Sequence, residues 1–434
     1  MSTSLEARLK EDGVQTLEAA FGDLHGALRG KRFPVAQAHH LDAHGFATCR
    51  AVLGWDIQCG IFPIEVASFE NGYPDLIARP IWETLRRVPW RPGSALVLSD
   101  VFETDGTTPL EESPRWALKS VLARARKLGF EPRVGVEMEF YLLGADRKPP
   151  YGGVQAYSLS WGSQIEPVVA DLREKLGAFG IEVEASHTEY GPAQLEINLA
   201  YGEALESADR ALLFKYAVKE IARQHGLIAT FMAKPWAEES GSGLHVHQSL
   251  WAANGGGNLF AKDRSLAERY LAGQLATVRE FSAFGSPTVN SYKRIQDASF
   301  APVNATWGRD NRSVAIRSLL AEPGSASRLE LRTASSDANP YLVIAGAIAG
   351  RLHGVERRLE LKEPPQEKNA YAAQAPRLPE TLQDALGLLE GSAVGRDYFT
   401  PRFLRNFLAV GRHEWQVFIK TVTDWERSRY LETP

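Results

Sequence analysis

Val134-Gly-Val-Glu-Met-Glu-Phe140 alternates apolar and polar or small residues along seven positions. Alternation with a period of two is typical of a β-strand, because side chains at positions i and i+2 lie on the same face. One face of this segment is therefore apolar, and the other carries Glu137 and Glu139. Residues two apart on a strand are separated by roughly 6.6 Å along its axis. The two carboxylates are thus spaced to address two neighbouring cations.

Three further segments show the same alternation. Gln194–Leu199 places Glu196 on its polar face, Leu244–Ser249 places His245 and His247 there, and Arg328–Arg332 places Arg328, Glu330 and Arg332 there. For any one segment, the alternative is a solvated polar face on an amphipathic strand. Four such segments together favour one cavity that holds carboxylates, imidazoles and guanidinium groups. Divalent cations bound together with an anionic, phosphate-bearing substrate require that mixture, and oxygen-rich ligands without thiolate favour Mg²⁺ or Mn²⁺ over zinc.

Composition excludes several classes of protein. The chain has 434 residues, of which 44% are hydrophobic and 24% charged, as in ordinary globular proteins. A formal net charge of -4 and the lack of a Lys/Arg-rich block argue against nucleic acid as a partner. Cys49 and Cys59 are the only cysteines, which fits a reducing cytoplasm. The polar N-terminus is unlike a signal peptide, and no apolar run approaches the ~20 residues of a membrane span. We therefore expect a cytoplasmic protein without a membrane partner.

The order of the segments indicates two domains, 1–105 and 106–434. The first contains short strand-like runs at 36–40, 51–55, 61–66 and 95–101. Ser113-Pro114 is the N-cap and first-turn signal of a helix that runs through Lys127. Beyond it, helices and strands alternate irregularly, which favours an α+β fold with an antiparallel sheet. The expected helices are 115–128, 164–179, 206–225, 265–284, 339–361, 380–390, 399–408 and 410–430.

Several ordered motifs resemble the glutamine synthetase superfamily. They are His187–Asn198 (HTEYGPAQLEIN), Lys234–Ser249 (KPWAEESGSGLHVHQS), Asn311–Arg317 (NRSVAIR), and Arg328–Arg332 followed by Asn339–Tyr341. Phe21–Gly26 with Arg29–Lys31 also resembles the opening of that family, so the likeness covers nearly the whole chain. It implies a small N-terminal β-grasp-like domain and a larger C-terminal catalytic domain, whose antiparallel sheet forms a funnel-like active site flanked by helices. It also implies ATP as co-substrate, two or more Mg²⁺ or Mn²⁺ ions, L-glutamate, and self-association into rings, commonly dodecamers.

The same resemblance implies roles for individual residues. The ligands of the first metal would be Glu139, Glu189 and Glu196, and those of the second Glu137, His245 and Glu330. Substrate-binding residues would be Gly241, His245, Arg294 and Arg332, and catalytic residues Asp56, Glu189, Arg312 and Arg332. Nucleotide-binding residues would be Tyr201, His247, Ser249, Arg312 and Arg317. Arginine suits the phosphate contacts because its fork is bidentate and permanently charged. Tyr201 is also open to interpretation as a core aromatic, His247 as a structural support, and His187 as a partner that orients Glu189.

The chain departs from the glutamine-forming pattern at the nucleophile end. Glutamine synthetases carry a lid of the form Tyr-Glu-Ala-Pro, whereas this chain reads Ser299-Phe-Ala-Pro302. Phe300 has no charge to attract ammonium and accepts no proton, but it packs against carbon. This change resembles the γ-glutamyl-amine ligase branch, which includes γ-glutamylpolyamine synthetases. Asp56 matches the family's ammonium-binding acid.

We therefore predict an ATP-dependent ligase that joins the γ-carboxyl group of L-glutamate to an organic amine through a γ-glutamyl phosphate, with Phe300 in the amine pocket. One alternative is a glutamine synthetase that uses ammonium. Others are a non-catalytic structural or regulatory member of the superfamily, and phosphoryl transfer to a guanidino acceptor. The identity of the amine stays open. Trp161 and Trp307 are candidate apolar walls for a monoamine, whereas a polyamine would need acidic groups along the entrance.

Overall fold

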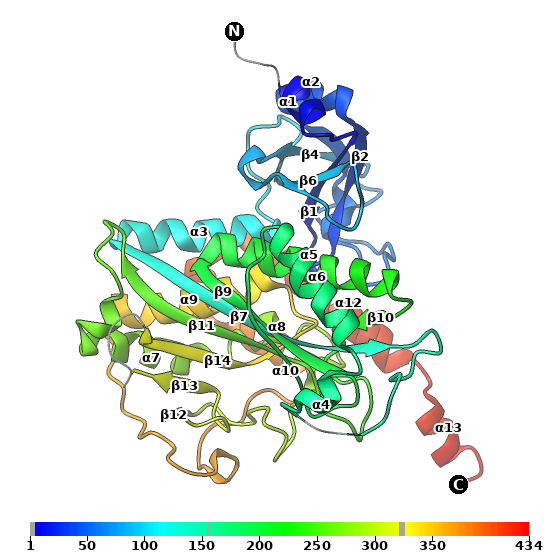
Figure 1. Ribbon diagram of the computed structural model, residues 1–434. Helices are drawn as coiled ribbons and strands as arrows, with labels where there is room; N and C mark the ends of the chain where they lie inside the picture. Colours follow the sequence, from blue (N-terminus) through cyan, green and yellow to red (C-terminus); the bar gives the residue numbers. More distant parts are fainter. Residues whose placement is uncertain (1–4, 154–155, 321–325, 434) are drawn as a thin grey trace.

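The computed structural model describes residues 5–153, 156–320 and 326–433, which form two β-sheets with flanking helices (Figure 1). The strands of the first sheet are β1 (Thr16–Gly22), β2 (Leu28–Pro34), β3 (Phe46–Cys49), β4 (Asp75–Pro80), β5 (Arg86–Arg87) and β6 (Ser94–Phe102). Their order is β2-β1-β6-β4-β3, with β5 also on β6. The pair β1–β6 is parallel and the other pairs are antiparallel.

The second sheet is larger and carries the candidate site. Its strands are β7 (Phe130–Leu143), β8 (Val183–Thr188), β9 (Gln194–Glu203), β10 (Ile228–Thr230), β11 (Gly243–Ala252), β12 (Trp307–Arg309), β13 (Ile316–Leu319) and β14 (Arg328–Ser335). Their order is β12-β13-β14-β11-β7-β9-β8, with β10 also on β7. All pairs are antiparallel except β12–β13. The four alternating segments thus lie in the adjacent strands β14, β11, β7 and β9.

The helices lie around these sheets. They are α1 (Leu5–Glu11), α2 (Ala38–His44), α3 (Pro114–Lys127), α4 (Leu159–Gly162), α5 (Glu166–Ala178), α6 (Ala204–Gln224), α7 (Arg264–Thr277), α8 (Ser282–Gly285), α9 (Pro340–Glu356), α10 (Leu382–Gly391), α11 (Ala393–Tyr398), α12 (Pro401–Lys420) and α13 (Asp424–Tyr430). Helices α3 and α6 pack on β7, and α9 packs on both helices. The expected α+β fold is confirmed.

The apolar faces of the four strands explain why the sheet is built this way. Val134, Met138 and Phe140 of β7 are fully buried, as are Leu244 and Val246 of β11. They belong to one continuous core that also includes residues of α3, α6 and α9. Because apolar and polar residues alternate, burial of one face against the helices leaves the charged face on the opposite side of the sheet.

Some expected elements take a different form in the structure. The runs at 36–40 and 51–55 are helical turns rather than strands, and 61–66 forms only an isolated bridge from Ile64 to Ala67. The helix expected at 265–284 is divided into α7 and α8, and the two expected at 399–408 and 410–430 form α12 and α13. The helix that begins after Ser113 is confirmed, since the Ser113 hydroxyl accepts a hydrogen bond from the Trp116 backbone.

The two sheets are joined by specific contacts. The Asn339 side chain, which caps α9, donates hydrogen bonds to the carbonyls of Asp23 and Leu24. Asn406 of α12 likewise donates to the carbonyl of Leu53. Helix α13 extends away from the body of the molecule at the C-terminal end (Figure 1).

Candidate active site

The strand register brings the charged side chains together in pairs. Glu137 of β7 lies opposite His245 of β11, and Glu139 of β7 lies opposite Glu196 of β9. On the other side of β11, His247 lies opposite Glu330 of β14. Directly opposed residues of an antiparallel pair have Cβ atoms about 5 Å apart, so six of the predicted site residues share one face of four neighbouring strands.

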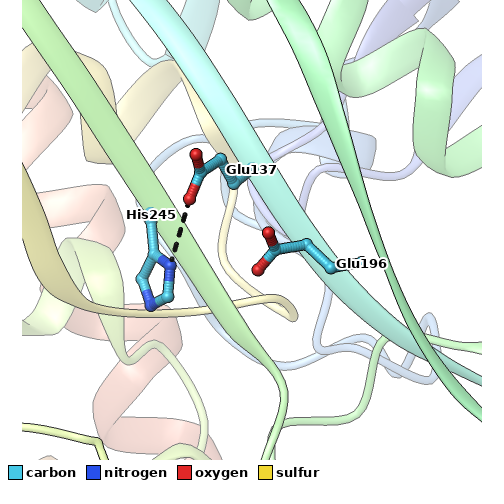
Figure 2. A group of neighbouring side chains, drawn as sticks. All are labelled: Glu137, Glu196 and His245. Carbon is cyan, nitrogen blue, oxygen red and sulfur yellow. Dashed lines mark ion pairs between the residues drawn. The ribbon is translucent and has the colours of Figure 1, made fainter. Parts of the chain in front are cut away.

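Among the residues that the structure describes, three groups of side chains have ligand atoms that all lie within 4.8 Å of one another. They are Glu137–Glu196–His245 (Figure 2), Glu137–His247–Glu330 and His187–Glu189–Glu196. Glu137 and Glu196 each belong to two groups, so the three form one continuous cluster. Within it, His245 Nδ1 lies 3.6 Å and His247 Nε2 lies 3.1 Å from the Glu137 carboxylate.

Glu189 is held by strand β8 and the turn that follows it. Its backbone donates a hydrogen bond to the Gln194 carbonyl, and His187 lies between Glu189 and Glu196, 3.4 Å from the first carboxylate and 3.0 Å from the second. The interpretation of His187 as a partner of Glu189 therefore agrees with its position. Glu139 belongs to none of the three groups; its carboxylate accepts hydrogen bonds from the Gly243 backbone and the Gln194 side chain.

The electrostatics of the cluster indicate a shortage of positive charge at one end. Burial and the negative charges of Glu139 and Glu196 raise the pKa of Glu189 to about 7. Burial would also raise the pKa of Glu330, but Arg332, His247 and His245 outweigh it and lower that pKa to about 2. A divalent cation beside Glu189, Glu139 and Glu196 would relieve their mutual repulsion. Carboxylate and imidazole ligands fit Mg²⁺ or Mn²⁺.

The arginines surround the Glu330 end of the cluster. Arg332 pairs with Glu330 and donates to the Arg312 carbonyl at 3.2 Å, while Arg317 pairs with Glu330 at 3.0 Å and also with Asp310. The Arg312 side chain is exposed. Arg312 is therefore the exposed guanidinium of the three, whereas Arg317 and Arg332 are paired with carboxylates.

Arg294 is a second deeply buried arginine of the site, beside Arg332. It is 6% exposed, burial lowers its pKa, and its Nη1 has no hydrogen-bond partner among the described residues. A Cβ atom at Gly241 would lie 2.7 Å from Arg294 Cγ, so glycine at that position avoids a steric clash with the Arg294 side chain. A buried guanidinium with an unpaired donor is suited to an anionic ligand.

A cavity of about 290 Å³ adjoins the cluster. Its walls include the predicted residues Glu137, Tyr201, His247 and Ser249, together with Arg133, Gly135 and Arg328. Tyr201 is 54% exposed and so is not a core aromatic. Arg328 donates a hydrogen bond to His247 Nδ1 at 3.2 Å, which gives His247 a second contact besides Glu137. Arg328 was placed on the polar face of its segment but was given no role of its own, and Arg133, which precedes Val134, was not singled out.

Asp56 lies elsewhere in this chain. Its carboxylate accepts hydrogen bonds from the backbones of Gln58 and Gly60 and lies 3.7 Å from His413 of α12. Within the described residues, the contacts of Asp56 are with its own loop and α12 rather than with the carboxylate cluster. Of the predicted site residues, Asp56 is therefore the one that a single chain does not bring to the others.

Phe300 lies beside the cluster and has an aromatic neighbour. Its ring stacks on that of Tyr190, with centroids 5.8 Å apart and planes at 25°. Tyr190 directly follows Glu189 in the motif HTEYGP, so its place next to a predicted site residue was visible in the sequence. The contact between Tyr190 and Phe300 was not visible there. The two tryptophans considered as walls are placed differently. Trp307 is 4% exposed in the core, and Trp161 lies against Gly153.

The comparisons with known proteins agree with this geometry. The family described as glutamine synthetase, catalytic domain, matches residues 111–430. A type-1 glutamine synthetase of Dictyostelium discoideum is 36% identical over 96% of this chain and 83% of its own length. A γ-glutamylethanolamide synthetase of Streptomyces coelicolor (99% and 95% covered) and a glutamate–isopropylamine ligase of a Pseudomonas species (98% and 96%) are also 36% identical.

A solved structure of GmaS in complex with ADP superposes with a TM-score of 0.88, at 31% identity, over 99% of this chain and 100% of that one. In the part of the chain that the structure describes, no helix is both long and apolar enough to cross a membrane. The family match spans most of the chain, and these relatives cover nearly all of it. The chain therefore belongs to the glutamine synthetase family and is an ATP-dependent glutamate ligase.

Proposed function

We propose that this protein joins the γ-carboxyl group of L-glutamate to an organic amine: ATP + L-glutamate + amine → γ-glutamyl-amide + ADP + phosphate. The observation that carries the proposal is the stacked pair Tyr190–Phe300 beside Glu189. A glutamine synthetase needs an acid at the lid to attract ammonium and to accept its proton. An aromatic pair offers an apolar surface instead, and ammonium has no carbon to bury against it.

The carboxylate cluster fits two divalent cations. Glu137, His245 and Glu330 would hold the cation of the nucleotide, and Glu139, Glu189 and Glu196 the cation near the γ-carboxyl group of glutamate. Bound there, the cations supply neutralisation of phosphate charge during transfer. The repulsion that raises the pKa of Glu189 supports this assignment, since a cation is the group that such a cluster lacks.

The remaining residues receive roles from their position. The cavity with Tyr201, His247 and Ser249 would hold the nucleotide, and the ADP bound to the related GmaS supports that assignment. Arg312, Arg317 and Arg332 would contact phosphate oxygens, and Arg294 with Gly241 would contact glutamate. Phosphorylation converts the carboxylate, a poor electrophile, into a γ-glutamyl phosphate whose leaving group is stable. The amine then attacks the carbonyl carbon, and a base removes its proton.

Asp56 is the base we assign, and it would come from a neighbouring copy of the chain. In its own chain its contacts are with its loop and α12 rather than with the cluster. This supports assembly into rings in which each site lies between two copies, commonly twelve in all. Exposed apolar residues at the C-terminal end give further support, because such patches mark interfaces; Val422 is 67% exposed, Trp425 60% and Leu431 79%.

The relatives support an organic amine. Two of those at 36% identity are named for ethanolamide synthesis and for isopropylamine ligation. Another of the same identity is a glutamine synthetase, so ammonium is the alternative nucleophile.

The discriminating measurement is kcat/KM for ammonium and for a panel of organic amines, followed as ATP-dependent phosphate release and product mass. We expect at least one organic amine to exceed ammonium clearly. Phe300→Glu should move the preference toward ammonium, and Phe300→Tyr, which keeps the ring, should not. If ammonium exceeds every amine in the unmodified protein, the chain is a glutamine synthetase with a substituted lid.

A further inference from the structure

Three exposed aromatic side chains gather beside the carboxylate cluster, and we call them the aromatic collar: Tyr157, Tyr190 and Phe300. Their exposed fractions are 63%, 49% and 53%. Tyr190 stacks on Phe300, and the ring of Tyr157 lies on that of His187, with centroids 4.5 Å apart. The backbone of Tyr157 donates a hydrogen bond to the Thr188 carbonyl. Tyr157 and Tyr190 of the collar therefore lie at the end of β8, close to His187 and Glu189.

Two of the three residues stand on strained backbone. Tyr157 has φ +61° and Phe300 has φ +58°, in the left-handed region that bulky side chains avoid. Such strain is usually retained where the surrounding structure fixes it for a function. Deep burial of the ring does not compensate for the backbone strain at either residue, since both are more than half exposed. The conformation instead holds the two rings at the entrance to the cluster.

The aromatic collar faces both negatively and positively charged side chains. Glu189 and Glu196 lie within electrostatic reach of the Tyr157 hydroxyl, as do the guanidinium of Arg312 and the hydroxyl of Tyr190. His187 lies beneath the Tyr157 ring. The carboxylate side of the collar is therefore the side at which the proposed function places the γ-carboxyl group of glutamate, and the amino group of the acceptor would face it. A second ammonium group on the acceptor would come within reach of the Arg312 guanidinium, which repels it. The exposed Asp297, three residues before Phe300, is the nearby acid of that loop.

We propose that the aromatic collar is the acceptor pocket and that it takes primary monoamines with a short hydrocarbon chain, in preference to diamines and polyamines. The amino group faces the side of the cluster that carries Glu189, and the hydrocarbon chain lies against the exposed parts of the stacked rings of Tyr190 and Phe300. This inference rests on the proposed function and adds the class of amine and the roles of Tyr157 and Tyr190. Each methylene buried against the rings should raise kcat/KM about fourfold until the chain extends beyond them.

The test uses the purified full-length protein with Mg²⁺, ATP and L-glutamate. kcat/KM is measured for ammonium, methylamine, ethylamine, n-propylamine and n-butylamine, and for the diamines of three and four carbons. We expect a rise of about fourfold for each added carbon and then a plateau. We expect each diamine to be at least about tenfold poorer than the monoamine of the same length.

The variants separate the collar from the rest of the site. Tyr190→Ala and Phe300→Ala should flatten the dependence on chain length while KM for ATP and for glutamate stays within about twofold. Tyr190→Phe keeps the ring and should keep the dependence. An unchanged dependence on chain length in both alanine variants would overturn the collar as the pocket.

The possible failures are distinguishable. If ammonium exceeds every amine, the proposed function itself fails. If a diamine exceeds the monoamine of equal length, the protein is still a glutamate–amine ligase and only the monoamine class is overturned. In that case Asp297→Asn should reduce the diamine activity and leave the monoamine activity unchanged, which would identify Asp297 as the partner of the second ammonium.

Discussion

At the scale of single residues, the site depends on carboxylates that ordinary folding would not place together. Glu330 is fully buried, yet its pKa is lowered to about 2 because Arg332, His247 and His245 counter the effect of burial. At Glu189, His187 and His245 do not outweigh burial and the charges of Glu139 and Glu196, and the pKa is raised to about 7. The cluster is thus balanced by fixed cations at one end only. At the other end, a bound cation has to supply the balance.

Removal of a single carboxylate tests this balance. Glu330→Gln keeps the shape of the side chain but removes the negative charge, so we expect ATP-dependent activity to fall by at least about a hundredfold, as for loss of a metal-bound group. Glu367→Gln, at an exposed residue that pairs with Arg309, is the matched control and should keep full activity. Near-normal turnover of Glu330→Gln at saturating Mg²⁺, with a normal KM for ATP, would contradict the assignment.

Lys215 gives a prediction on stability rather than activity. It is buried, its ammonium donates to the carbonyls of Asp337 and Ala338, and burial together with Lys219 lowers its pKa to about 8. Between pH 8 and the unfolded pKa of about 10.5, the unfolded chain binds more protons than the folded one, so stability rises with pH in this window. The contribution is about 3 kcal/mol at most.

The measurement is the free energy of unfolding in urea at pH 7.5, 8.5 and 9.5. Lys215→Met should show a flatter dependence on pH than the unmodified protein, since the titrating group is gone. Lys127→Met, at an exposed position in the last turn of α3, should follow the unmodified protein. Parallel pH profiles for Lys215→Met and the unmodified protein would show that Lys215 is not the group responsible.

At the scale of elements, the strands were predictable and their partners were not. Period-two alternation is a local signal, so β7, β9, β11 and β14 were evident from the sequence. The pairing of Glu137 with His245, and of His247 with Glu330, is set by the register between strands distant in sequence, and no local pattern encodes it. From the sequence, only the resemblance to a family indicated that these residues belong to one site. Residues 36–40 were misread for a related reason, because a short apolar run has the same appearance in a helix and in a strand.

The crossing of α7 and α9 depends on glycine. A Cβ atom at Gly354 would lie 2.6 Å from Gly273 Cα, and one at Gly273 would collide with the backbone of Gly350 and Gly354. Backbone atoms cannot move aside as a flexible side chain does, so Gly354→Ala should force the helices apart and cost roughly 1–3 kcal/mol or more. The measurement is the midpoint of thermal or urea unfolding.

Gly387 provides the matched control for this helix crossing. It lies within α10, is exposed, and has nothing within 4 Å of the position that a Cβ would take. Gly387→Ala should therefore be neutral or stabilising by up to about 1 kcal/mol, as expected for alanine in a helix interior. Equal effects of Gly354→Ala and Gly387→Ala would mean that the close approach of α7 and α9 is not what requires glycine.

At the scale of the whole molecule, the distance between Asp56 and the cluster is the main feature that one chain leaves unexplained. Asp56 lies in the part of the molecule that carries the first sheet, with Gln58, Gly60 and His413 as its contacts. The carboxylates lie on the second sheet. The sequence and the resemblance predicted a role for Asp56, but nothing in the alternation of strands shows which copy of the chain it serves. The proposed ring assembly resolves this, since each site would combine Asp56 of one copy with the cluster of its neighbour.

Mixing two inactive variants tests that arrangement directly. Asp56→Ala subunits keep an intact cluster, and Glu139→Ala subunits keep Asp56. Each variant alone should be nearly inactive. In randomly mixed rings formed at equal concentrations, about a quarter of the sites would combine an intact cluster with an intact Asp56, so about a quarter of the original activity should return. The control mixes Asp56→Ala with the double variant Asp56→Ala/Glu139→Ala, in which no copy supplies Asp56, and it should stay inactive. Native mass spectrometry of the mixtures establishes that hybrid rings have formed. Hybrid rings without recovered activity would show that Asp56 does not act across the interface, and full activity in a monomer would show that no second copy is needed at all.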